Sequence, residues 1–106
     1  MKSRSLAVVS FAALIALPLF AAAPEGATLY KSKCASCHGA DGAGTTPAGK
    51  AMKVRDLRSD EVQKQTDIEL TKVISGGKGK MPAYGKQLTT AQVQDLIAFL
   101  RTLKAK

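Results

Sequence analysis

Apolar residues recur at helical spacing near the end of the chain. They fall at positions i, i+3, i+4, i+7 and i+10, and they are Val93, Leu96, Ile97, Leu100 and Leu103. Residues at this spacing share one face of a helix. Thr89 and Gln92 precede them in the order of a capping box, in which each side chain accepts a hydrogen bond from the other residue's backbone N–H. The pattern predicts an amphipathic helix from about residue 89 to residue 103.

The same signals predict further helices earlier in the chain. Thr66 and Glu69 form a second capping box ahead of apolar residues at helical spacing, and Gly76-Gly77 ends that segment. Residues 25–37 are mostly tolerable helix formers and predict a first helix. A short additional helix is predicted near residues 59–64.

The segment that follows the predicted helix over residues 25–37 has a different composition. Residues 39–53 are rich in glycine and include Pro47, which favours irregular backbone. A long loop in a compact domain needs a reason, and wrapping around a ligand is one. Strand patterns are nearly absent along the chain. We therefore predict an all-α domain of three to four helices.

The first residues follow the layout of a secretory signal peptide. A basic start at Lys2 and Arg4 is followed by an apolar run over residues 6–20 and by three alanines. We predict a signal peptide over residues 1–23 and a folded domain over residues 24–106. Cleavage after Ala23 would leave Pro24 at a poor position for a peptidase, so a cut a few residues away or a retained transmembrane anchor remains an alternative.

Length and charge limit what such a chain can do. The 106 residues allow one small domain and exclude a multidomain enzyme. The chain has 16 Lys+Arg against 8 Asp+Glu, and the predicted signal peptide contains only Lys2 and Arg4 of the basic residues. The basic excess therefore belongs to the folded domain. We do not expect a nucleic-acid partner, because the protein is exported and its lysines lack interleaved aromatic residues.

The domain has few large apolar residues for its size. Its only aromatic residues after Pro24 are Tyr30, Tyr84 and Phe99. A core in a domain of about 80 residues rarely supplies more than about 3 to 5 kcal/mol, so such domains usually carry disulfides, a metal or a large cofactor. We therefore expect a bound group at the centre.

The segment Cys34-Ala35-Ser36-Cys37-His38 indicates what that group is. C-x-x-C-H is the attachment pattern of a c-type haem. Two thiols three positions apart can each form a thioether with one haem vinyl group, and the following residue places its imidazole on the iron. We predict one covalently bound haem c, attached through Cys34 and Cys37 and ligated by His38.

Three other chemical roles are possible for a motif of this composition. A structural zinc site needs four ligands, and the chain offers only Cys34, Cys37 and His38. A thioredoxin-like redox pair belongs near a βαβ pattern, which is missing here. A disulfide between such close neighbours closes too short a loop to stabilise much. The haem interpretation is favoured over all three.

A second axial ligand to the iron must come from another residue type, because the sequence has no second histidine. Methionine is the natural candidate. Met52 precedes Lys53 in a polar stretch, whereas Met81 lies in a glycine-rich loop in which Pro82 stiffens the backbone beside the sulfur. We predict Met81 as the ligand, with core filling as the alternative role for a single methionine.

Across the whole domain the sequence resembles the class I cytochromes c, which are small single-haem electron carriers. The matching segments are the C-x-x-C-H motif with Gly39, Asp41-Gly42-x-Gly44, Met81-Pro82 and Phe99-Leu100-Arg101. The resemblance implies a small helical fold wrapped around one covalent haem. It also implies that Gly26 and Tyr30 meet Leu96 and Phe99 where the first and last helices cross, and that the Pro47 carbonyl accepts the N–H of His38. Unlike many relatives, the chain has no Trp.

Ligation by both His38 and Met81 would leave no open position on the iron, so we expect an electron carrier and not an enzyme. We expect it in the bacterial periplasm, where haem attachment and an oxidising environment occur together, with no stable membrane insertion after signal removal. Lys78, Lys80 and Lys86 flank Met81 and suggest redox partners with acidic docking patches.

Two alternatives to the mobile carrier remain. The first is a haem c subunit of a larger dehydrogenase or oxidase. The second is a gas-binding or peroxidase-like protein, which requires that Met81 does not bind the iron.

Overall fold

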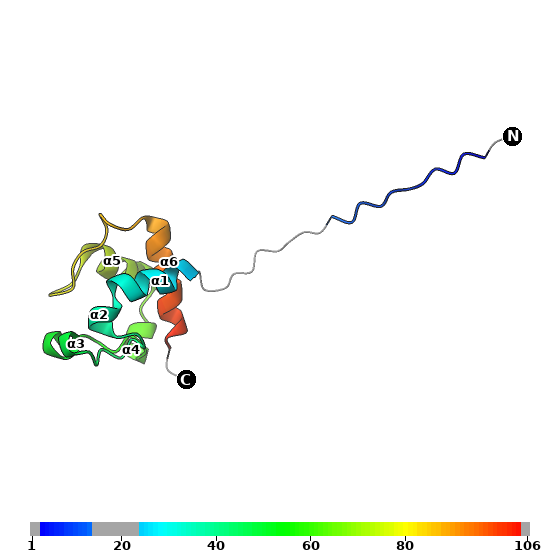
Figure 1. The fold of residues 1–106 in the computed structure, drawn as a ribbon. Helices are drawn as coiled ribbons and strands as arrows, with labels where there is room; N and C mark the ends of the chain where they lie inside the picture. The colour runs from blue at the N-terminus through cyan, green and yellow to red at the C-terminus, as the bar shows by residue number, and fades with distance from the viewer. Residues whose placement is uncertain (1–2, 14–23, 105–106) are drawn as a thin grey trace.

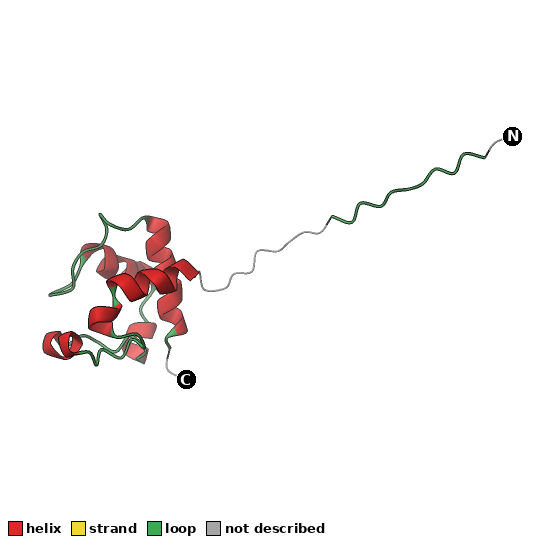
Figure 2. Ribbon diagram, in the orientation of Figure 1, coloured by secondary structure: helices red, strands yellow, loops and turns green. Residues whose placement is uncertain are grey.

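The computed structural model describes residues 3–13 and 24–104. The described residues form six helices, which are α1 (Pro24–Lys33), α2 (Ala35–His38), α3 (Pro47–Met52), α4 (Asp60–Gln63), α5 (Asp67–Gly76) and α6 (Thr90–Thr102) (Figure 1). They contain no strand, only an isolated bridge between Lys78 and Met81 (Figure 2). The predicted all-α class is confirmed, with more and shorter helices than expected.

Two details of the helix prediction were wrong. The predicted helix over residues 25–37 is broken at Cys34, whose φ of −116° departs from helical values and which becomes the N-cap of α2. The predicted irregular segment contains α3. That helix forms because Thr46 caps it by accepting the N–H of Gly49, and because Pro47 occupies its first position, where a missing N–H costs nothing.

The two predicted capping boxes are both present. Thr66 and Glu69 form one at the start of α5, and Thr89 and Gln92 form the other at the start of α6. In each box, both backbone N–H groups find the partner side chain, with donor–acceptor distances between 2.9 and 3.2 Å. The local sequence therefore determines where the two helices begin.

Helices α1 and α6 cross in direct contact. The crossing is close at Gly26, where a Cβ atom would collide with the carbonyl oxygen of Asp95. Nearby, the rings of Tyr30 and Phe99 pack with centroids 4.8 Å apart. The predicted meeting of Gly26 and Tyr30 with the last helix is confirmed.

The core lies between α1, α4, α5 and α6. Its buried apolar residues are Tyr30, Val62, Leu70, Ile74, Leu88, Val93, Leu96, Ile97 and Leu100. Four of the five residues that predicted the face of α6 are among them, and Leu103 packs against the cluster from a partly buried position.

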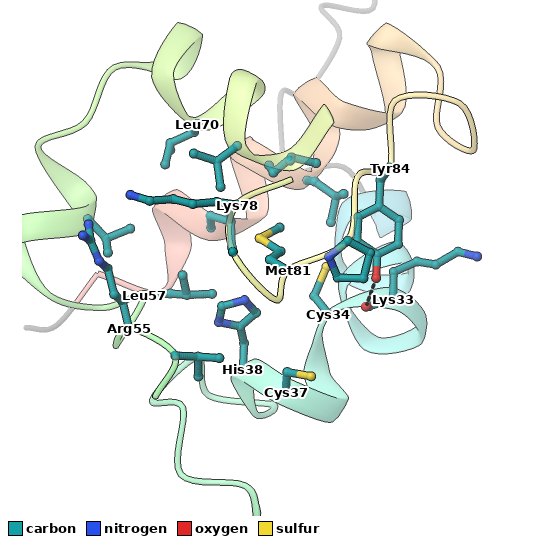
Figure 3. Close-up of a pocket in the computed structure, with 18 of the residues that line it drawn as sticks. Lys33, Cys34, Cys37, His38, Arg55, Leu57, Leu70, Lys78, Met81 and Tyr84 are labelled. Carbon is teal, nitrogen blue, oxygen red and sulfur yellow. Dashed lines mark hydrogen bonds between the residues drawn. The ribbon is translucent and has the colours of Figure 1, made fainter. Parts of the chain in front are cut away.

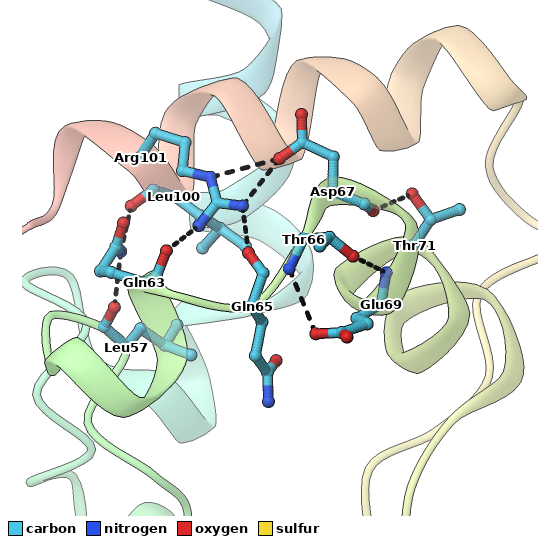
Figure 4. A network of polar contacts seen from close by, with 9 residues as sticks. All are labelled: Leu57, Gln63, Gln65, Thr66, Asp67, Glu69, Thr71, Leu100 and Arg101. Carbon is cyan, nitrogen blue, oxygen red and sulfur yellow. Dashed lines mark hydrogen bonds and ion pairs between the residues drawn. The ribbon is translucent and has the colours of Figure 1, made fainter.

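A polar network attaches α6 to the end of α4, the start of α5 and the loop between them (Figure 4). The guanidinium of Arg101 donates to the carbonyl oxygens of Gln63 at 2.7 Å and Gln65 at 2.6 Å, and to the carboxylate of Asp67 at 2.7 Å. The side-chain amide of Gln63 donates to the carbonyls of Leu57 and Leu100. One end of α6 is therefore fixed by side-chain hydrogen bonds as well as by apolar packing.

The predicted signal peptide falls largely outside the described residues, which exclude residues 1–2 and 14–23. Residues 3–13 form no helix or strand, and Leu6, Val8, Val9 and Phe11 are exposed there. Within the described ranges, none of the helices has the length and apolar character needed to cross a membrane.

Candidate functional site

The C-x-x-C-H motif spans the break between α1 and α2. Cys34 still donates its backbone N–H to the carbonyl of Tyr30 in α1, and its own carbonyl accepts the N–H of His38 at 3.0 Å. One short turn of helix thus separates the two thiols and ends on the imidazole. Gly39 follows at a φ of 83°, a conformation that glycine adopts without strain, and ends α2.

All four residues predicted for the site line one cavity of about 400 Å³. Figure 3 shows the side chains of His38 and Met81 facing one another across it, with Cys34 and Cys37 to one side of His38. The structure therefore brings together residues that are more than forty positions apart in the sequence. Met52 also lines the cavity, but it is 43% exposed.

The cavity is continuous with the core. Six of the buried core residues line it, namely Tyr30, Val62, Leu70, Ile74, Leu96 and Leu100. Leu57 and Val73 add further apolar surface. Apolar walls of this kind suit a large flat hydrophobic group with a few polar attachment points.

Backbone hydrogen bonds hold Met81 above the cavity. Met81 and Lys78 exchange N–H···O bonds of 2.9 and 3.2 Å, which close a tight turn with Gly79 at a φ of 57°. The N–H of Tyr84 donates to the carbonyl of Ile74 at 2.9 Å and attaches the loop to the end of α5. Glycines in this segment thus allow the turn, as the sequence indicated.

His38 is partly buried, and its Nδ1 is buried without a hydrogen-bond partner. Burial lowers the pKa of the imidazole, and the nearby backbone of Arg55 partly opposes this effect. His38 is therefore neutral at physiological pH, which is the form that binds a metal ion. A neutral imidazole whose Nδ1 has no partner, in an apolar cavity, fits the axial ligand of a haem iron.

The predicted hydrogen bond from His38 to Pro47 is not found. Pro47 begins α3 and is exposed, and its carbonyl is directed along that helix. The backbone group that influences the imidazole belongs to Arg55 instead. Thr46, which precedes Pro47, holds α3 against α2, because its hydroxyl donates to the carbonyl of Cys37 at 2.9 Å.

No disulfide joins Cys34 and Cys37. Burial raises the pKa of Cys34 to about 11, and the neighbouring Cys37 adds to the shift. Redox-active C-x-x-C pairs have lowered thiol pKa values, so this environment does not favour disulfide chemistry. The described residues also contain no cluster of three or more His, Cys, Asp and Glu side chains that could hold a metal ion.

Several contacts around the site have no signal in the sequence. Tyr84 donates its hydroxyl to the carbonyl of Lys33 at 3.2 Å, which links the Met81 loop to α1, and burial raises its pKa. Tyr30 donates to the carbonyl of Gly39 at 2.6 Å, and burial raises its pKa as well. Arg55 reaches the cavity from a segment outside every helix. Only the tertiary fold reveals these contacts.

Comparisons with known proteins agree with this arrangement. The family described as cytochrome C oxidase, cbb3-type, subunit III, matches residues 21–100. Cytochrome c6 of Gloeothece citriformis is 33% identical over 97 residues, which cover 90% of this chain and 84% of the relative. The cbb3-type cytochrome c oxidase subunit CcoP of Azospirillum brasilense is 32% identical over 85 residues, but the match covers only 29% of that protein.

A solved structure gives the same result for the fold. The KustC0563 c-type cytochrome superposes with a TM-score of 0.70 at 30% identity, covering 76% of this chain and 98% of the other. Fold, motif and cavity together define a small class I c-type cytochrome. The chain belongs to the cytochrome c family that includes the cbb3-type oxidase subunit III domain, and it carries one covalently bound haem c that serves electron transport.

Proposed function

We propose that this protein is a periplasmic one-electron carrier in which Cys34 and Cys37 bind the haem and His38 and Met81 are the axial ligands of its iron. The observation that carries the proposal is that these four side chains line a single apolar cavity, with His38 and Met81 facing one another. A haem c bound there supplies a one-electron couple, which His/Met ligation shifts to higher potential.

The chain's own residues have three tasks in this function. The thiols of Cys34 and Cys37 add to the two vinyl groups and tether the haem. His38 stays neutral because it is partly buried, so its nitrogen lone pair is free for the iron. The apolar residues of α5 and α6 exclude water from the haem faces. Because both ligands come from the protein, no substrate reaches the iron, and we propose no enzymatic activity.

The targeting of the chain follows from its first residues. We propose that residues 1–23 are a signal peptide and that residues 24–106 form the exported cytochrome domain. Support comes from the basic start, the apolar run and the alanines at its end. N-terminal sequencing of the protein purified from periplasm would identify the new first residue, and a start at Met1 or Lys2 would contradict the assignment.

The redox partners should present acidic surfaces. Lys78, Lys80 and Lys86 are exposed around the Met81 loop, and no lysine in the described ranges forms an ion pair. Unpaired lysines beside the haem can steer an acidic partner. The rate of electron transfer to a physiological partner should then fall as ionic strength rises, and a rate independent of salt would contradict the docking proposal.

The visible spectrum tests the ligand assignment. We expect the protein exported from cells with c-type maturation machinery to be low-spin and six-coordinate. Met81→Ala should convert it to a high-spin form, because the sulfur ligand is lost. Met52→Ala is the matched control, since it removes the other methionine of the cavity, and should leave the spectrum unchanged.

Two results would contradict this assignment. A low-spin Met81→Ala spectrum would exclude Met81 as the ligand. A high-spin wild-type spectrum that binds carbon monoxide rapidly would favour a gas-binding or peroxidase-like protein.

One alternative has support from the comparisons. The family match to a cbb3-type oxidase subunit is the observation behind this alternative, a haem c subunit of a larger complex. Co-purification with a larger membrane or oxidase protein at physiological salt would support that alternative, and isolation as a free small protein would support the carrier.

A further inference from the structure

The Met81 loop, residues 77–85, is joined to the end of α5 at both of its own ends. The N–H of Gly77 donates to a carbonyl in the last turns of α5 at 2.8 Å, and the N–H of Gly85 donates to the carbonyl of Ser75 at 3.0 Å. A Cβ atom on Gly85 would lie 2.9 Å from that carbonyl oxygen. The two ends of the loop are therefore held tightly against one helix.

A single hydrogen bond ties the Met81 loop to a different part of the fold. The hydroxyl of Tyr84 donates to the carbonyl of Lys33 at 3.2 Å, and Figure 3 shows this bond beside Cys34. Lys33 is the last residue of α1, where carbonyls lack partners within the helix. Among the described residues, no other hydrogen bond or ion pair joins the loop to a residue that precedes α5.

The remaining contacts of the loop hold it only weakly. Its exposed residues include Lys78, Gly79, Lys80, Pro82 and Ala83. Met81 and Tyr84 pack against the core from partly buried positions. Segments with few buried apolar contacts open locally without global unfolding. For such a segment, one hydrogen bond of ordinary net strength changes the fraction that is open about three- to tenfold.

We propose that Tyr84 is a positioning residue, whose hydroxyl holds the Met81 loop closed and so determines how often Met81 leaves the cavity. The inference rests on the proposed function, because it takes Met81 as an iron ligand. Met81 and Tyr84 are three positions apart in one short segment with fixed ends, so opening at one displaces the other. The bond to Lys33 thereby limits the access of external ligands to the iron.

Amide hydrogen exchange of the haem-loaded protein measures the opening of the loop. The N–H groups of Tyr84 and Gly85 report it, because both donate to carbonyls of α5 in the closed loop. Tyr84→Phe keeps the ring and its packing and removes only the hydroxyl. We expect both amides to exchange about three- to tenfold faster in this variant. The N–H of Val54, which donates to Gly49, should keep its rate, because opening there leaves the Tyr84 bond intact.

Imidazole added to the oxidised haem-loaded protein gives a second readout. It binds the iron only where Met81 has left it, so its apparent affinity rises with the fraction of open loop. We expect Tyr84→Phe to increase the affinity for imidazole by the same factor as it increases amide exchange. A variant that only lowered overall stability would not produce this agreement between the two factors.

Tyr30→Phe is the matched control. It also removes a tyrosine hydroxyl that donates to a backbone carbonyl, in this case that of Gly39 at 2.6 Å. The Gly39 carbonyl keeps the N–H of Gly42 as a second donor at 3.1 Å. Neither contact involves the Met81 loop. The exchange rates of the Tyr84 and Gly85 amides, and the affinity for imidazole, should therefore stay at their wild-type values.

Three results would overturn the proposal while the wild type keeps a low-spin spectrum. They are unchanged amide exchange in Tyr84→Phe, an equal increase in Tyr30→Phe, and faster exchange without tighter binding of imidazole. Failure of the proposed function gives a different result. A high-spin wild type that binds imidazole as tightly as Met81→Ala would exclude Met81 as the ligand, and it would overturn this proposal as well.

Discussion

At the scale of single residues, the absence of one Cβ atom determines how closely two helices approach. Gly26 lies where α1 crosses α6, and a Cβ there would collide with the carbonyl of Asp95 and lie 3.3 Å from the Cβ of Phe99. Backbone cannot move aside as a flexible side chain can. The crossing must therefore open to admit any other residue, which would also disturb the packing of Tyr30 on Phe99.

We expect Gly26→Ala to destabilise the haem-loaded protein by about 1 to 3 kcal/mol, as overpacking of a close contact does. Gly76→Ala is the control, because Gly76 ends α5 with nothing within 4 Å of the added methyl group. That variant should lose no stability and should gain up to about 1 kcal/mol from the better helix former. Denaturant unfolding measures both, and equal stabilities of the two variants would contradict the close-contact explanation.

The local sequence indicates some of the candidate site residues and not others. Cys34, Cys37 and His38 are identified by a local spacing, and Met81 by elimination and its glycine-rich surroundings. Arg55 has no such signal, because its backbone and side chain reach His38 and the cavity only through the tertiary fold. The expected role of Pro47 failed for the same reason, since α3 carries that residue away from the imidazole.

At the scale of elements, local hydrogen bonds explain which helices were predictable. The starts of α5 and α6 are encoded within four residues by their capping boxes, so the sequence located them. The start of α3 depends on the Thr46 hydroxyl, which caps Gly49 and also bonds to carbonyls of α2. Because α3 depends partly on contacts with α2, and because Gly49 within it and the glycines before it favour irregular backbone, the local sequence does not predict this helix.

The attachment of α6 makes a prediction at this scale. Arg101 binds two carbonyls and one carboxylate between the last residue of α4 and the first residue of α5. We expect Arg101→Lys to destabilise the protein by about 1 to 2 kcal/mol, because an ammonium cannot reproduce the planar fork. Asp67→Asn should cost less than about 1 kcal/mol, since the Asp67 side chain is 62% exposed. Thermal unfolding compares the two, and a larger loss for Asp67→Asn would show that the carboxylate, and not the carbonyls, dominates the network.

At the scale of the whole molecule, the haem cavity occupies the position that the centre of the hydrophobic core takes in most small proteins. It borders buried residues of α4, α5 and α6 and has a volume of about 400 Å³. Without the haem, the apolar lining of this cavity would be exposed to water, which costs about 25 cal/mol per Å² of apolar surface. The total stability of a small domain is only about 5 to 15 kcal/mol. Folding and haem attachment should therefore be coupled, as they are for metals in small domains.

We accordingly expect a Cys34→Ala/Cys37→Ala variant produced without haem to lack a cooperative fold. Circular dichroism should show reduced helix content and a gradual loss of signal on heating, whereas the haem-loaded wild type should unfold in one sharp transition. Wild-type chain from cells without the maturation machinery is the control, because it lacks haem but keeps both thiols, and it should behave like the variant. A sharp transition in either haem-free chain would mean that α1, α5 and α6 fold without the cofactor, and that the haem enters a structure already formed.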